Sequence, residues 1–182
     1  MPFIVIAALA LNAVTGGNGG DAGKTPTSGP LATVSAAAPP QAKAQFANCT
    51  KVLQLLPVSL RSLAPRIVHT RPDTPFVVAW GNPAIVFSCG AARPASLTPG
   101  SNAQFQSGGE LRGPYYDVTR RGDANVWTTV DREPYVSITI PRKYQGADYI
   151  PVLSGPIARA LPPVCSTSRD EPDVTKLCTR RK

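Results

Sequence analysis

The sequence has few charged side chains, and this scarcity limits the kind of protein that it can encode. Only 16% of its 182 residues are Asp, Glu, Lys or Arg, against roughly a quarter in an average soluble domain. A long disordered acidic or basic chain is therefore excluded. The length fits one domain of roughly 100–200 residues once an N-terminal extension is set aside.

Histidine is nearly absent, and this argues against the common catalytic and metal sites. His69 is the only histidine, and the four cysteines form no C-x-x-C pair, so a zinc site is not expected. The chain has no G-x-S-x-G motif, and His69 stands just before Arg71-Pro72-Asp73 in a loop-like setting. Such a histidine is more typical of a surface than of a catalytic base. The sequence predicts no catalytic residue, no metal site and no cofactor.

No apolar run is long enough to span a bilayer, although a shorter one lies near the N-terminus. Residues 3–14 are apolar, which matches a signal-peptide core and falls short of the ~20 residues of a transmembrane helix. No Lys or Arg precedes this run, unlike in an ordinary export signal. We interpret residues 1–14 as a signal-like or anchor-like segment, the alternative being a buried strand or helix. The expected protein is extracytoplasmic, either secreted or membrane-anchored at its N-terminus.

The next segment is dominated by small and turn-forming residues. Residues 15–45 contain mostly Gly, Ala, Pro, Ser and Thr, and such a segment cannot bury enough apolar surface to offset its ordering entropy. It is predicted to be a flexible linker. Residues 46–163 are then expected to form a single globular domain, followed by a basic, disulfide-looped tail at residues 164–182.

The four cysteines are Cys49, Cys89, Cys165 and Cys178. An even number in a chain with an export-like segment predicts two disulfides, for which three connectivities exist. We favour Cys49 with Cys89, which would tie the first helix to a core strand, and Cys165 with Cys178, which would close the tail into a small loop. The alternative of four buried thiols applies to a cytosolic chain.

The pattern of apolar residues predicts an α+β fold. The 20 prolines and 15 glycines interrupt the chain too often for long helices to dominate. Helical spacing predicts one helix from about Asn48 to Leu56 and a second from Ile150 to Leu161, broken at Pro151 and Pro156. Strands are predicted at residues 76–80, 84–89, 115–118, 126–130 and 135–140. We expect a two-layer domain in which both helices cover one face of a mostly antiparallel sheet of about five strands.

The basic net charge bears on possible partners. The chain carries a formal net charge of +8, which suits an anionic partner such as a lipid or a wall polymer of the cell envelope. Its Lys and Arg residues are scattered, however, and no basic helix or aromatic-interleaved basic strand can be recognised. Nucleic acid is therefore not an expected partner, and dispersed solubilising charge is the simpler explanation.

Two groups of residues are candidates for a surface site. The densest polar cluster is Asp131-Arg132-Glu133; its carboxylates could share acid and base roles, but an ion pair at a turn or sheet edge is the commoner cause. Trp80 and Trp127 lie beside turn signals, where an exposed aromatic ring often binds carbohydrate or peptide. Burial in the core is the simpler expectation for both.

Several blocks of the sequence resemble a known family. Leu55-Leu56-Pro57 after Cys49, the run from Trp80 to Pro83 leading into Cys89-Gly90, and the block from Thr128 to Val136 are similar to an actinobacterial, mycobacterial-type family of exported or membrane-anchored proteins, domain of unknown function family 3515. The resemblance covers about residues 48–163. It implies an envelope location and supports the pairing of Cys49 with Cys89, and it supplies no activity.

Two function classes follow from these observations. The first is an uncharacterised exported envelope protein that serves as a non-enzymatic accessory or binding domain. The second is a hydrolase or transferase acting on envelope material through Asp131, Glu133 or Asp73. An enzyme should hold a buried carboxylate with a shifted pKa inside a cleft, whereas a binding domain should present an exposed aromatic or basic patch. A nucleic-acid binder is a weaker third class.

Overall fold

The structure is a computed structural model that describes residues 31–165 and 173–179. The predicted signal-like segment at residues 1–14 lies outside the described residues. Within the described part, no helix is long and apolar enough to cross a membrane. The elements in chain order are β1 (Val34–Ala37), α1 (Phe46–Leu55), β2 (Pro65–Arg66), β3 (Val68–Arg71), β4 (Val77–Trp80), β5 (Ile85–Ala91), β6 (Gln104–Phe105), β7 (Tyr115–Arg121), β8 (Ala124–Thr129), β9 (Tyr135–Pro141), α2 (Gly146–Ala160) and α3 (Val174–Thr179).

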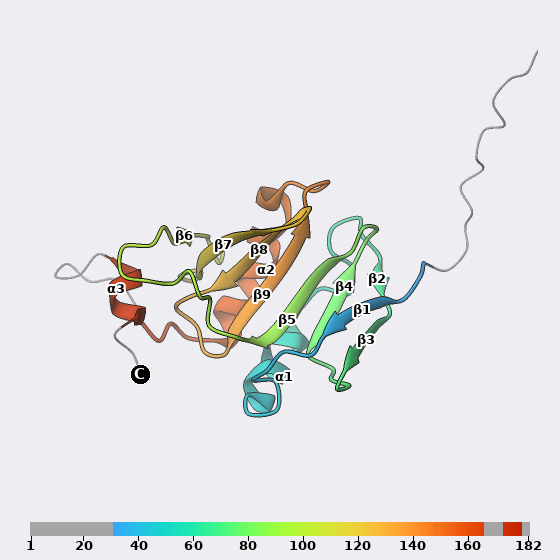
Figure 1. The fold of residues 1–182 in the computed structure, drawn as a ribbon, viewed down its shortest axis with the longest axis horizontal. Coiled ribbons are helices and arrows are strands. Elements are labelled where there is room, and N and C mark those ends of the chain that lie inside the picture. The colour runs from blue at the N-terminus through green and yellow to red at the C-terminus, as the bar shows by residue number, and fades with distance from the viewer. Residues whose placement is uncertain (1–30, 166–172, 180–182) are drawn as a thin grey trace, which may run out of the picture. The chain divides into compact units, whose positions relative to one another are not determined.

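Seven strands form one antiparallel sheet in the order β2-β4-β5-β9-β8-β7-β6 (Figure 1). The α+β class and the mostly antiparallel sheet are as predicted, but the sheet has more strands than the five expected. Those five are its central strands. The additional strands β2 and β6 have two residues each, which is too short for a periodic pattern. A separate pair, β1 with β3, is parallel.

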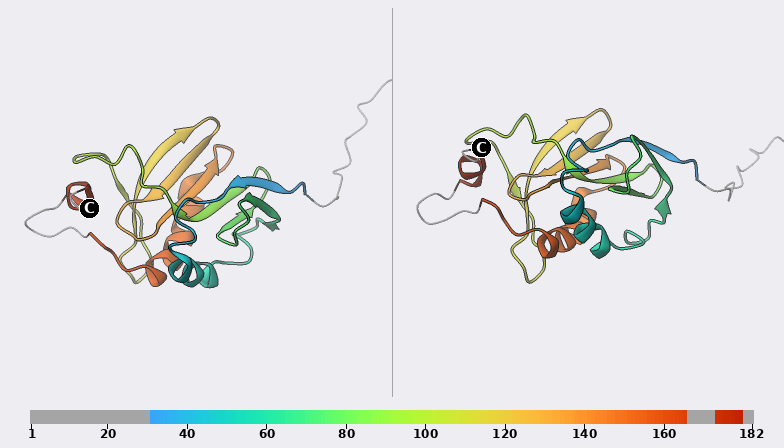
Figure 2. Two further views of the ribbon diagram at one scale, coloured as in Figure 1. Left: turned by 60° about the horizontal axis from the view of Figure 1, so that its bottom comes forward. Right: turned by 90° about the horizontal axis from the view of Figure 1, so that it is seen from below.

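One face of the sheet is covered by α1 and α2, which lie on the same side of it (Figure 2). Successive residues of a strand point to opposite faces, so the register places Phe87 of β5, Ile138 of β9 and Trp127 of β8 together on the covered face. The helices add Val52, Ile150, Leu153 and Ile157, all fully buried, to this core. The other face of the central strands carries Ser, Thr and Asp side chains interspersed with small or β-branched apolar ones.

The second helix is continuous, although its two prolines predicted a break. Pro151 and Pro156 each lack the N–H that would bond to the carbonyl four residues earlier. The helix nevertheless continues, because Ile150, Leu153 and Ile157 remain buried along its inner face. Burial of an apolar face is the main source of helix stability in a folded protein, and here it outweighs the missing hydrogen bonds.

Both disulfides have the pairing that the sequence favoured. Cys49 of α1 is bonded to Cys89 of β5, with Cα atoms 5.5 Å apart and both side chains fully buried. Cys165 is bonded to Cys178 of α3, with Cα atoms 5.3 Å apart. The first bond fastens the helical layer to the sheet, and the second fastens α3 to the chain that follows α2.

The tail contains a short helix that sequence reasoning did not foresee. Val174 and Cys178 of α3 belong to a second apolar cluster, together with Leu97 and Val130. The hydroxyl of Thr175 also accepts a hydrogen bond of 2.8 Å from the N–H of Gly100. The third helix therefore braces the loop between β5 and β6.

The segment before α1 is structured over its described part, although the predicted linker extended to residue 45. Here β1 pairs with β3, the N–H of Gln41 donates to the carbonyl of Gly90 at 2.9 Å, and Ala42 is only 7% exposed. Its small side chains bury little apolar area, which is why its composition suggested a linker. The same small size lets its backbone lie directly against the sheet.

Gly90→Ala is expected to lower the free energy of unfolding by about 3 kcal/mol, because it combines backbone strain with overpacking. Gly90 has a φ of +89°, and a Cβ there would lie 2.7 Å from the backbone nitrogen of Ala42. Gly100→Ala is the matched control, since Gly100 has a φ of +84° with nothing within 4 Å of the added carbon. It should lose only about 1 kcal/mol. Urea denaturation measures both, and equal losses would contradict the close approach at Gly90.

Candidate functional site

Four neighbouring strands place a continuous row of polar side chains on the face opposite the helices. Ser88 of β5 pairs with Ser137 of β9, and Thr128 of β8 pairs with both Ser137 and Asp117 of β7. Residues that face each other on adjacent strands lie about 5 Å apart at their Cβ atoms. The row is therefore an unbroken line of three hydroxyls that ends in a carboxylate. A second row on the same face consists of Val86, Thr139, Val126 and Thr119.

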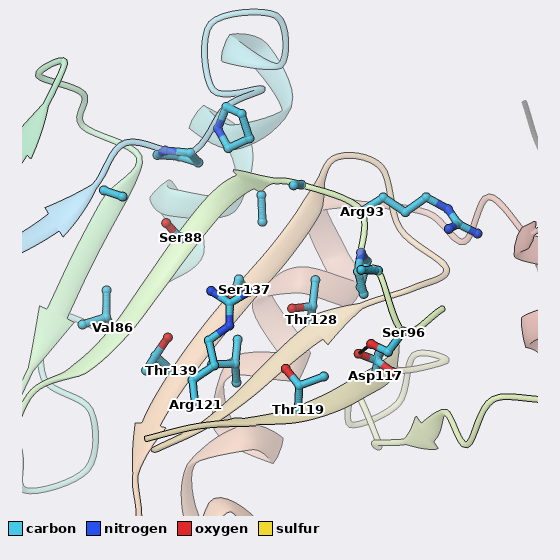
Figure 3. Close-up of a pocket in the computed structure, with 18 of the residues that line it drawn as sticks. Val86, Ser88, Arg93, Ser96, Asp117, Thr119, Arg121, Thr128, Ser137 and Thr139 are labelled. Atoms are coloured by element: carbon cyan, nitrogen blue, oxygen red, sulfur yellow. Dashed lines mark hydrogen bonds between the residues drawn. The ribbon is translucent and has the colours of Figure 1, made fainter. Parts of the chain in front are cut away.

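These two rows form the floor of a groove with a volume of about 730 Å³ (Figure 3). Its rim is formed by residues 36–40, at and after the end of β1, and by residues 91–96, at and after the end of β5. The rim consists mostly of Ala and Pro. Because these side chains are short, Ser88, Ser137 and Thr139 remain partly exposed in the floor, whereas Thr128 and Asp117 are buried.

The groove carries more positive than negative charge. Three arginines, Arg93, Arg120 and Arg121, line it together with a single carboxylate, Asp117. Arg93 donates to the carbonyl of Leu97 at 3.1 Å and Arg120 alternates with the floor residues of β7, so Arg121 is the arginine whose side chain starts on the floor face. Arg121 is at the end of β7, on the same face of the sheet as Thr119 and Asp117, and its side chain is labelled in Figure 3 with those of Thr139 and Ser137. The carboxylate is already engaged, since the hydroxyl of Ser96 donates to its Oδ2 at 2.6 Å. This bond also ties residues 91–96 to β7.

The arrangement of the groove is suited to binding an anion-bearing ligand. Hydroxyl and guanidinium groups donate hydrogen bonds to phosphate and carboxylate oxygens. A serine nucleophile needs an adjacent base, and no histidine or lysine is among the lining residues. No aromatic side chain is among them either, so the groove does not offer the stacking surface on which sugar rings often bind.

The two tryptophans proposed as surface residues lie elsewhere, on the helix-covered side. Trp80 is 2% exposed, and its indole N–H donates to the carbonyl of Val58 at 3.0 Å. Trp127 packs edge-on against Tyr116, with ring centroids 5.9 Å apart, and a Cβ on Gly146 of α2 would lie 2.9 Å from its ring. Neither indole lines the groove, and both contribute to packing beneath the helices.

Asp131 and Arg132 form a buried ion pair rather than a surface turn. Arg132 Nη1 lies 3.0 Å from Asp131 Oδ2, and neither side chain is exposed. The other carboxylate oxygen of Asp131 accepts from the N–H of Tyr115 at 2.9 Å, and Arg132 Nη2 donates to the carbonyl of Arg112 at 2.7 Å. The backbone carbonyl of Asp131 accepts from the N–H of Val164 at 2.9 Å. The pair thus joins the start of β7 to the chain that follows α2.

Burial shifts the titration of this pair. Loss of solvation raises the pKa of Asp131, and the neighbouring Arg132 guanidinium opposes that shift. Burial likewise lowers the pKa of Arg132, against the attraction of Asp131. A buried carboxylate with a raised pKa is also what a catalytic acid requires. Here, however, both oxygens are held by protein groups, and Asp131 does not line the groove.

The remaining candidates for an acid–base site are not gathered around Asp131. Glu133 is exposed, and so are Asp73 and His69. None of the three lines the groove; His69 instead borders a shallow recess between β1 and β3. Among the described residues, no three His, Cys, Asp or Glu side chains are grouped so that they could hold a metal ion. The structure therefore does not bring the proposed carboxylates into one cleft.

Sequence reasoning did not name the residues that line the groove. Part of the signal was available, because the strict alternation in β9 placed Ser137 and Thr139 on the wet face of a strand. Asp117 in β7 and Thr128 in β8 likewise alternate with core residues along their strands. Strand order and register were needed to bring them into one row.

Comparison with known proteins gives one family match. The family model described as protein of unknown function (DUF3515) matches residues 1–165. No curated protein and no solved structure matches the chain.

Proposed function

The chain belongs to this DUF3515 family of unknown function, and we propose that it is an extracytoplasmic binding domain of the cell envelope. It is secreted or membrane-anchored at its N-terminus, as the resemblance to an actinobacterial family of exported proteins implies. Its two disulfides fit that location, because disulfides persist in oxidising compartments and are rare in the cytosol. Its ligand is an anionic, chain-like wall polymer that lies in the groove on the open face of the sheet.

The row of hydroxyls, in a groove that Arg121 also lines, is the observation that supports this ligand class. Ser137 and Thr128 lie at the centre of the floor and present hydroxyl groups in register. Charge-assisted hydrogen bonds from arginine to phosphate or carboxylate are among the stronger polar contacts in proteins. A groove open along the sheet also accepts a long chain more readily than a closed pocket would.

The alternative functions have less support from the described residues. A hydrolase or transferase that uses Asp131, Glu133 or Asp73 would need these carboxylates in a common cleft, and Asp131 is instead engaged in a fully buried ion pair. A nucleic-acid binder usually combines a basic groove with aromatic side chains that stack on bases, and none lines this groove.

Arg121→Gln is expected to weaken binding of a fluorescently labelled polyglycerol-phosphate wall polymer about tenfold, the effect of losing one hydrogen bond to a charged group. Ser137→Leu should weaken it at least as much, because a branched side chain would then occupy the centre of the floor. Fluorescence anisotropy of the full chain measures both affinities. Added salt should weaken binding by the wild type more than binding by Arg121→Gln.

Arg159→Gln is the matched control, since Arg159 is exposed on α2, on the opposite side of the sheet. It removes the same charge and should change the affinity less than twofold. Thermal unfolding of each variant verifies that the fold is retained. If Arg159→Gln weakened binding as much as Arg121→Gln, the attraction would belong to the overall charge and not to the groove.

A further inference from the structure

Exposed apolar side chains are concentrated in one stretch of the chain, and none of them lines the groove. Of the seven large hydrophobic side chains that are exposed in the described part, five lie between residues 31 and 67. They are Leu31 (47% exposed), Phe46 (60%), Leu55 (42%), Val58 (81%) and Ile67 (69%). Isolated apolar residues on a surface are ordinary, but this clustering in a stretch of fewer than forty residues is not.

The same stretch is the part of the chain where positive charge is unopposed. Residues 31–72 contain five Lys or Arg residues and no Asp or Glu. They therefore hold five of the eight net positive charges of the chain. Apolar side chains interspersed with unopposed cations are the composition of surfaces that bind anionic membranes.

The loop after α1 holds its exposed residues in a fixed position. The backbone carbonyl of Val58 accepts the indole N–H of Trp80, while the side chain of Val58 points to solvent. Leu60 and Leu63 exchange two backbone hydrogen bonds of 3.0 Å, and Leu60 is fully buried. This tight turn presents Arg61, which is exposed and has a φ of +55°.

Several contacts join this loop to the first residues that the structure describes. Val58 lines a shallow recess together with Pro65 and Arg66. The guanidinium of Arg66 donates to the carbonyl of Ala32, and the N–H of Val34 donates to the carbonyl of Ile67 at 2.9 Å. Leu31, which precedes Ala32, and Ile67, which lies between β2 and β3, therefore belong to the same border.

We propose that this border rests on an anionic lipid bilayer. The apolar edge, defined as Leu31, Val58, Arg61 and Ile67, inserts its aliphatic side chains among the headgroups, and Arg61 pairs with lipid phosphates. Charge complementarity favours a bilayer over a second copy of this chain, because two acid-free basic edges repel each other. The chain also enters the edge at Leu31, and residues 15–30 connect that point to the apolar run at residues 3–14. The groove is not part of this surface, so the edge and the groove can be tested separately.

Quenching by brominated lipid tests the orientation directly. In the full chain, Val58→Trp should be quenched strongly on vesicles of brominated phosphatidylcholine and phosphatidylglycerol. Leu111→Trp is the matched control, because Leu111 is also exposed (48%) but lies outside the apolar edge. The native tryptophans give the same background in both variants. Binding through residues 3–14 alone would bring the two probes to the bilayer without preference and would quench both equally. Equal quenching of the two variants, or no quenching of either, therefore overturns the proposal.

Partitioning measurements test the two kinds of contact. Arg61→Gln should reduce binding to phosphatidylglycerol-containing vesicles roughly fivefold, the effect of one basic residue near an anionic surface. Val58→Asp should reduce it about tenfold, because it removes an inserted aliphatic side chain. Leu111→Asp and Arg159→Gln should leave it within twofold. Unchanged partitioning of both edge variants, or an equal loss in the controls, would show that the edge does not contact lipid, and would leave the groove proposal intact.

Discussion

Arg132→Met is expected to lower the free energy of unfolding by about 3–5 kcal/mol at neutral pH, the usual result of removing one partner from a buried ion pair. Neither side chain of the pair is exposed, so Asp131 would be left charged without a counterion. Arg132 Nη2 also donates to the carbonyl of Arg112, and that acceptor would lose its partner. Urea denaturation of the wild type and the variant measures the difference.

The loss should depend on pH in a defined direction. Burial raises the pKa of Asp131 and Arg132 opposes that shift, so removing Arg132 raises this pKa further. A carboxyl whose pKa is higher in the folded state stabilises the fold below its unfolded pKa of about 3.9. That contribution is lost as the pH rises through the folded pKa. The deficit of Arg132→Met should therefore be greatest near neutral pH and shrink towards pH ~4.

A double variant separates the charge from the packing. Asp131→Asn combined with Arg132→Met removes both charges, and the asparagine oxygen can still accept from the N–H of Tyr115. It should recover a substantial part of the stability, because no buried charge remains without a partner. Arg142→Met, at an exposed arginine, should change stability by less than about 0.5 kcal/mol. If the loss of unfolding free energy in Arg132→Met did not depend on pH, and the double variant recovered none of it, Arg132 would act only through its volume.

Replacing both Cys49 and Cys89 by alanine is expected to lower the free energy of unfolding by about 4 kcal/mol. The disulfide closes a loop with a sequence separation of 40, and the chain-entropy description gives about this value for a loop of that length. Both sulfurs lie in the main core, so the substitution also leaves unfilled space. Denaturant unfolding under non-reducing conditions measures the loss.

Removing the other disulfide should have a smaller and more local effect. Cys165 and Cys178 are separated by 13 residues, for which the same description gives about 3 kcal/mol. Because α3 belongs to the smaller apolar cluster, its double alanine variant should expose the amides of α3 to hydrogen exchange while those of β5 and β9 stay protected. Loss of protection in the central strands, to the same extent as in the Cys49/Cys89 variant, would contradict this division of the fold.

The central fold could be predicted because its residues repeat with the period of their elements. In β9, Val136, Ile138 and Ile140 alternate with polar residues, and the apolar face of α2 repeats with helical spacing. The edge strands were missed because two residues cannot form a pattern. The segment up to Ala42 was predicted to be part of a linker because of its composition. A flexible tether and a backbone packed against Gly90 can both be rich in alanine and proline, so composition does not distinguish them.

The candidate site was less predictable for a different reason. A row such as Ser88, Ser137, Thr128 and Asp117 exists only after strand order and register are set, and hydroxyl residues on the wet face of a strand have no distinctive spacing. The cluster Asp131-Arg132-Glu133 was read as a charged turn because three consecutive charges are usually solvated. Only the fold shows that Arg112, Tyr115 and Val164 supply partners that allow the first two to be buried.

The two-residue strands at the borders of the sheet have a consequence for behaviour at high local concentration. A sheet grows by strand addition when its outermost strands offer a long row of unpaired N–H and C=O groups. Here β2 offers only Pro65 and Arg66, and proline has no N–H to donate, while β6 is equally short. Copies at high local concentration would therefore find almost no template for strand addition at either end of this seven-stranded sheet, which should favour a monodisperse protein.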